Sequence, residues 1–162
     1  MQNRGLLEST LRKIPGFRGY LEKEYRRESD QLHRSWLADR LTRSKRSLDE
    51  FSRGLADTGQ IDALPAFDRL RGRLDKLIGR IRGGMQGYSG FFDLVQVDEA
   101  LLDRVYQYDV SLMDKVEALA EGIEQLPVGG AGSPQSAADL LRQIEELEQA
   151  WDLRTDMLKG VE

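Results

Sequence analysis

The chain has 162 residues, enough for one domain with a sizeable core, and its 24 basic and 28 acidic residues leave a net charge of −4. It has no cysteine, which excludes disulfides, thiolate metal sites and a cysteine nucleophile. The first residues do not form a secretory signal, and no apolar run approaches the roughly 18 residues of a membrane-spanning helix. We therefore expect a cytoplasmic protein.

The first predicted element is a short amphipathic segment that ends at Pro15-Gly16, a pair that favours a turn. Phe17, Tyr20 and Tyr25 follow at spacings that could hold this corner against the main body. The apolar side of the segment consists of Leu6, Leu7, Leu11 and Ile14.

Two long helices are predicted next. One runs from Phe17 to Asp57, with a near-heptad of leucines after Leu37 and polar Ser44 within it, and Thr58-Gly59 ends it. The other opens between Ile61 and Leu64, and its apolar pattern is strong as far as Ile81 and weaker beyond. Its apolar positions are Phe67, Leu70, Leu74, Leu77, Ile81 and Tyr88.

Two more helices follow. Asp98 is predicted to cap the fourth, with Glu99 in its first turn. Residues 127–134 form a linker rich in glycine and proline, and Ser133-Pro134 is typical of the start of a fifth helix, which Gly160 closes. The apolar seams are Leu102, Val105, Leu112, Val116, Leu119, Ile123 and Leu126 in the fourth helix, and Leu140, Ile144, Leu147, Trp151 and Leu158 in the fifth.

These patterns predict an all-α fold, because no strand-like alternation bounded by turns occurs. We expect an elongated antiparallel bundle of three long helices, with a short N-terminal helix and a linked C-terminal helix. The bundle core would span residues 1–126, the flexible linker 127–134, and the C-terminal amphipathic helix 135–162.

A row of glycines lies opposite the apolar side of the third helix, and each interior glycine costs a helix about 0.8–1 kcal/mol relative to alanine. One interpretation is a partner-contact face that admits a second helix closely, by analogy with small-residue packing in membranes. In the other interpretations the helix ends near Gly83-Gly84 with a loop over residues 85–97, or it tolerates exposed glycines. The residues of the predicted contact face are Gly72, Gly79, Gly83, Gly87 and Gly90.

Asp109 interrupts the seam of the fourth helix between Val105 and Leu112. A buried carboxylate there needs an arginine partner or becomes neutral. It could be a proton site or polar ligand contact, or a structural ion pair or tyrosine hydrogen bond, with Tyr106 and Tyr108 nearby. If the seam is rotated, Asp109 lies in water.

The sequence provides no convincing catalytic, metal or cofactor site. His33 is the only histidine, whereas carboxylate-bridged di-metal bundles need two Glu-x-x-His pairs, so we expect a solvated or partly packed side chain. The glycine runs at 83–87 and 129–132 lack the strand and the Gly-Lys-Ser/Thr of a phosphate loop. A small acidic group matches no metal-binding loop, and its members are Asp93, Asp98, Glu99 and Asp103.

The charge is divided unevenly along the chain. Residues 12–53 hold 12 basic and 7 acidic residues, whereas residues 98–162 hold 5 and 15. The basic residues either form a solvated face that pairs partly with the acidic helices, or contact an anionic surface. The candidates for such contacts are Arg26, Arg27, Arg34, Arg40, Arg43, Lys45 and Arg46.

Several short segments resemble a family of uncharacterised bacterial all-helical proteins over roughly residues 14–126. The segments are Ile14–Tyr20, Glu22–Arg27, Gly87–Asp93 and Val97–Arg104. The resemblance implies an all-helical fold and no particular activity. The order of a short amphipathic helix, a long hairpin and a linked last helix also resembles that of phage-shock membrane-remodelling proteins, in architecture alone.

From these features we expect a non-enzymatic scaffold or protein-interaction protein without a cofactor, which forms homo-oligomers or binds a protein partner. The glycine face and the tethered fifth helix are the candidate contacts. The alternative is binding to a membrane surface or, second to that, to nucleic acid, through the basic second helix and the N-terminal segment.

Overall fold

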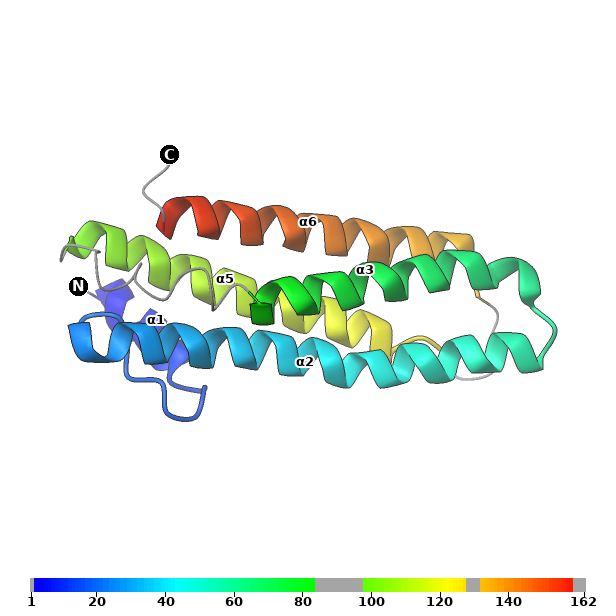
Figure 1. Ribbon diagram of the computed structural model, residues 1–162, viewed down its shortest axis with the longest axis horizontal. Helices are drawn as coiled ribbons and strands as arrows, with labels where there is room; N and C mark the ends of the chain where they lie inside the picture. The colour runs from blue at the N-terminus through cyan, green and yellow to red at the C-terminus, as the bar shows by residue number, and fades with distance from the viewer. Residues whose placement is uncertain (1, 84–97, 128–131, 159–162) are drawn as a thin grey trace.

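Four long helices lie side by side along one axis in the computed structural model, which describes residues 2–83, 98–127 and 132–158 (Figure 1). They are α2 (Lys23–Asp57), α3 (Leu64–Gly83), α5 (Glu99–Glu124) and α6 (Pro134–Leu158). A short helix, α1 (Gln2–Leu11), packs against α5 at one end, and a 3-10 turn, η1 (Ile61–Ala63), precedes α3. The described residues contain no strand, so the predicted all-α bundle is confirmed.

The four helices form a closed ring in the order α2, α3, α6, α5. Each packs against two neighbours: α2 against α3 and α5, and α6 against the same two helices. The helices α2 and α5 run in one direction along the axis, and α3 and α6 run in the other (Figure 1). Consequently α3 and α5 occupy opposite corners of the bundle and are antiparallel to each other.

The helix starts follow the capping chemistry expected from the sequence. The Asp98 carboxylate accepts hydrogen bonds from the backbone N–H groups of Ala100 (3.0 Å) and Leu101 (3.5 Å). The Ser133 hydroxyl accepts one from the N–H of Ser136 at 3.1 Å. Both predicted caps are therefore confirmed, because each oxygen satisfies a donor that has no partner within the helix.

The second helix begins at Lys23, six residues later than predicted. The segment between α1 and α2 buries Ile14, Phe17 and Tyr20 but is not helical, because Gly19 has a φ of +100° and Glu22 is extended. A Cβ atom on Gly19 would lie 2.6 Å from the Tyr106 hydroxyl oxygen, so this turn requires glycine. Tyr25 is only half-buried.

The C-terminal helix belongs to the same core as the other three. Its apolar stripe, from Leu140 to Leu158, is buried against α3 and α5. Gly132 lies in the connection between α5 and α6. A Cβ atom added to it would lie 3.1–3.2 Å from side-chain atoms of Leu55, Phe67 and Ala63. The predicted linked C-terminal helix is therefore confirmed, and it packs within its own chain: α6 completes a four-helix bundle with the three long helices, so its apolar face is covered and is not available as a tethered contact.

The third helix is described as far as Gly83, and the residues that would decide whether it continues to Gly90 lie outside the described range. Gly160, the predicted end of α6, also lies outside it. Within the described residues, no helix is long and apolar enough to cross a membrane.

Candidate functional site

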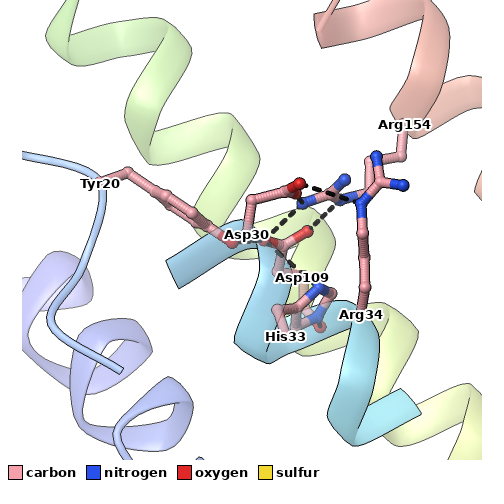
Figure 2. A network of polar contacts seen from close by, with 6 residues as sticks. All are labelled: Tyr20, Asp30, His33, Arg34, Asp109 and Arg154. Atoms are coloured by element: carbon pink, nitrogen blue, oxygen red, sulfur yellow. Dashed lines mark hydrogen bonds and ion pairs between the residues drawn. The ribbon is translucent and has the colours of Figure 1, made fainter. Parts of the chain in front are cut away.

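A cluster of six buried polar side chains lies inside the bundle, near the end where α2 and α5 begin (Figure 2). At its centre is Asp109 of α5, which is fully buried. The Tyr20 hydroxyl donates to its Oδ2, and Arg154 of α6 donates from Nε to Oδ1 at 2.5 Å and from Nη2 to Oδ2 at 3.2 Å. We call this group the polar cluster, and its members are Tyr20, Asp30, His33, Arg34, Asp109 and Arg154.

Arg154 joins carboxylates from two other helices. Besides Asp109 of α5, its Nη2 donates to Oδ1 of Asp30 in α2 at 2.6 Å. Asp30 also forms an ion pair with Arg34 one turn later, with 2.9 Å between Oδ2 and Nε. Both guanidinium groups lie over the Trp151 ring, at 5.1 Å for Arg34 and 5.4 Å for Arg154, within range of a cation–π attraction. Two carboxylates and two guanidinium groups thus balance in charge.

His33 is fully buried, so the expectation of a solvated or partly packed side chain is wrong. Its Nε2 lies 3.1 Å from the backbone carbonyl oxygen of Asp109. Because that oxygen can only accept, we infer that Nε2 carries the proton of the neutral ring. Nδ1 is buried without a hydrogen bond in the described structure, and 3.8 Å separates it from Oδ2 of Asp109.

Burial and the neighbouring charges determine the protonation states in the cluster. Burial acts to raise the pKa of Asp109, but the Arg154 charge and the hydrogen bonds from Arg154 and Tyr20 outweigh it, so the pKa is lowered and Asp109 is ionised. Burial lowers the pKa of His33, which favours the neutral ring. Burial and the Asp109 charge raise the pKa of Tyr20 well above its ordinary value. The two carboxylates also keep Arg154 charged despite its burial.

The N-terminal segment is tied to the cluster through the backbone of Tyr20 as well as its hydroxyl. Its N–H donates to the Tyr106 hydroxyl at 2.7 Å, and Nε of Arg26 donates to its carbonyl at 2.6 Å. The Tyr20 ring also contacts Phe17 edge-on, with 5.3 Å between ring centroids. Each part of Tyr20 is therefore bound, and the segment before α2 is held against α5.

The prediction for Asp109 is confirmed in its structural form: the carboxylate is buried and has both an arginine and a tyrosine partner. The tyrosine is Tyr20 rather than Tyr106 or Tyr108. Sequence reasoning missed Asp30, Arg34 and Arg154 as members. An acid and an arginine four residues apart were visible in α2, but nothing in the pattern showed that they face inward.

The predicted basic contact surface on α2 is corrected for three of its seven residues. Arg26 and Arg34 are buried, and Arg40 is 8% exposed, pairing with Glu117 of α5 at 2.8 Å and with Glu124. They cannot meet an external anionic surface because α5, α6 and the N-terminal segment cover them. Lys45 is partly exposed and pairs with Asp75 of α3 at 2.6 Å. The exposed members are Arg27, Arg43 and Arg46.

The glycine face is exposed where it is described. Among the residues that the structure describes, nothing lies within 4 Å of a Cβ atom added to Gly72, Gly79 or Gly83. Gly87 and Gly90 lie outside the described residues. Of the acidic group, Asp98 is the cap of α5, Glu99 is exposed and Asp103 is half-buried, whereas Asp93 is outside the described range. No group of three or more potential metal ligands occurs among the described residues.

Comparison with protein-family models, curated proteins and solved structures finds no match to this chain. The family resemblance of the N-terminal and central segments therefore stays a prediction.

Proposed function

We propose that the protein is a non-enzymatic helical scaffold that binds proteins, further copies of itself included, through its outer faces. The observation that carries this proposal is the closure of the polar cluster. Its acids and bases bind one another, and none of its six residues is more than 6% exposed.

A general acid or base must come within hydrogen-bond reach of a substrate. In the polar cluster, both Asp109 oxygens are occupied by Tyr20 and Arg154, and Arg154 spans α6, α2 and α5. Such an arrangement supports a structural role, because it fixes the position of three helices and the N-terminal segment relative to one another. Buried polar groups that specify a unique arrangement are known from coiled coils.

The outer face of α3 supports the binding part of the proposal. Helix glycines are unfavourable, yet within the described part of the chain no neighbouring side chain or backbone lies close enough to Gly72, Gly79 or Gly83 to explain them. A partner that approaches the backbone closely would supply a reason.

Light scattering on the purified chain over a concentration series tests the proposal. We expect a mass that rises above the 18.4 kDa of one chain. A mass that stays at one chain at every concentration would contradict self-association.

The alternative function, binding to a membrane surface or nucleic acid, keeps only Arg27, Arg43 and Arg46 as exposed members of its contact set. Sedimentation with anionic vesicles and binding to an oligonucleotide, both at low salt, compare the two functions. We expect the protein to bind neither the vesicles nor the oligonucleotide. Binding that disappears when Arg43 and Arg46 become glutamate would favour the alternative.

A further inference from the structure

Two exposed helix faces, one on α3 and one on α5 at opposite corners of the bundle, have the same residue spacing and charges of opposite sign. The first, on α3, has residues at steps of three and four that all lie on the surface; we call it the α3 stripe, and it consists of Arg69, Gly72, Lys76, Gly79 and Gly83. The second, the α5 stripe, has the same steps and is also exposed, and it consists of Ser111, Asp114, Ala118, Glu121 and Gln125. Each stripe carries two like charges seven residues apart.

The four charges of the two stripes have no charged partner among the described residues. Arg69, Lys76, Asp114 and Glu121 make no ion pair and no side-chain hydrogen bond within residues 2–83, 98–127 and 132–158. Other charged residues on these helices do make such pairs. On α3 they include Arg71, Arg73, Asp75, Arg80 and Arg82, and on α5 they include Asp109, Glu117 and Glu124.

The stripes complement each other in an antiparallel arrangement. Arg69 then lies opposite Glu121 and Lys76 opposite Asp114, because both pairs are separated by two helical turns. Gly72 lies opposite Ala118, so small residues face each other between the charges and the helices can approach closely. The contrast extends over the whole helices, since α3 has six basic and two acidic residues and α5 has two basic and seven acidic ones.

The two stripes cannot meet within one molecule, because α3 and α5 occupy diagonal corners and their outer faces point apart (Figure 1). They are antiparallel, so a second copy in the same orientation presents its α5 antiparallel to the α3 of the first. We propose that the α3 stripe of one copy docks on the α5 stripe of the next. Such a contact joins different surfaces of the two copies and leaves a free stripe at each end, so it extends into an open array.

This inference rests on the proposed self-association and names its surfaces. Exposed ion pairs are weak and are screened by salt, so the association is concentration-dependent and weakens as ionic strength rises. Sedimentation velocity on the full chain, between about 0.01 M and about 1 M salt, spans Debye lengths from about 30 Å to about 3 Å. The expected result is a broad series of larger species at low salt and one chain at high salt.

Charge reversal separates this surface from others. One variant, Arg69→Glu with Lys76→Glu, makes both stripes acidic; another, Asp114→Lys with Glu121→Lys, makes both basic. Each variant alone is expected to lose the larger species. An equal mixture of the two is expected to regain them, because every contact then joins an acidic to a basic stripe. The single chain with all four changes is also expected to associate, with reversed polarity.

The matched control is Arg46→Glu with Arg53→Glu, which reverses two exposed charges seven residues apart on α2. It makes the same change in net charge as the Arg69→Glu, Lys76→Glu variant and is expected to associate like the original chain. If the original chain associates but neither stripe variant reduces it, the proposed docking is wrong and self-association stands. If the original chain stays a single chain under all conditions, the proposed docking and the proposed self-association are both wrong.

Discussion

The two ends of the bundle are built in opposite ways. At the turn between α2 and α3 the interior is apolar: Phe51 and Phe67 pack edge to face with 4.8 Å between ring centroids, and Leu55 lies beside Gly132 of the α5–α6 connection. At the other end the interior holds the polar cluster. An apolar end depends on volume and shape, whereas a charged interior depends on every partner being present.

The ion pairs between helices also differ between the outer layer of the bundle and its interior. In the outer layer, the ion pairs that join the α2–α3 pair of helices to the α5–α6 pair have their arginine on α2 or α3. Their acid is on α5 or α6, as in Arg40–Glu117 and Arg73–Glu145. The buried pair Arg154–Asp30 has the reverse polarity, with the arginine on α6. If α6 shifted along the bundle, its acidic residues could still face basic residues in the outer layer, but Arg154 would move away from Asp30. The buried pair therefore supports a role of the polar cluster in fixing the position of α6.

The largest effect is expected from removing one member of the cluster. Asp109→Ala leaves Arg154 with one carboxylate and removes the acceptor of the Tyr20 hydroxyl, so it should lower the free energy of unfolding by about 3–5 kcal/mol. Urea unfolding followed by circular dichroism measures it. The exposed Glu50→Ala on α2, outside both stripes, is the control, with a change within about 0.5 kcal/mol. A small loss of unfolding free energy for Asp109→Ala would contradict the proposed dependence of the polar end on every partner.

Conservative substitutions sharpen the comparison. Phe67→Leu at the apolar end keeps the chemistry and most of the volume, and should cost less than about 1.5 kcal/mol. Arg154→Lys keeps the charge but not the planar fork that reaches Asp30 and Asp109 together, and should cost about 2–3 kcal/mol. The same unfolding measurement on both variants checks the order, and equal losses would contradict it.

The polar end should also respond to pH through His33. Its pKa is lowered in the folded protein by burial, so the unfolded chain binds a proton first as the pH falls. The contribution of neutral His33 to stability is present above the unfolded pKa of about 6.5 and is lost as the pH falls below it. The free energy of unfolding then decreases by at most about 1.4 kcal/mol per pH unit. Unfolding at several pH values between about 7.5 and about 5.5 measures the slope around that pKa. His33→Gln should flatten it, and an unchanged slope in that variant would assign the effect to other groups.

The smallest effects concern glycines. Gly72→Ala and Gly79→Ala, on the open face of α3, should each raise the free energy of unfolding by about 0.5–1 kcal/mol. Gly19→Ala, at the polar end, should lower it, because of its φ of +100° and the nearby Tyr106 hydroxyl. Thermal melts at a concentration too low for association separate these effects from self-association. A loss at Gly72 would mean that the chain itself uses this face.

The sequence by itself determined the helices and their inward seams. The steps of three and four from Leu102 to Ile123 define which side of α5 is buried, and Asp98 and Ser133 mark helix starts through local hydrogen bonds. The seam also indicated burial of Asp109, since a polar residue inside such a seam shares its direction, but a rotated seam would have left Asp109 in water, and the structure decided between the two. Each of these depends on residues a few positions apart.

Only the tertiary structure decided what meets inside. Tyr20 and Asp109 are 89 positions apart, and Arg154 lies 45 positions beyond Asp109, so no local spacing links them. Arg34 is buried while Arg27 and Arg43 on the same helix are exposed, because Arg34 is on the side of α2 that faces the bundle interior, against Trp151 of α6 and Asp30. A repeating pattern states which side of a helix is apolar, but which charged residues turn inward depends on the neighbour that covers them.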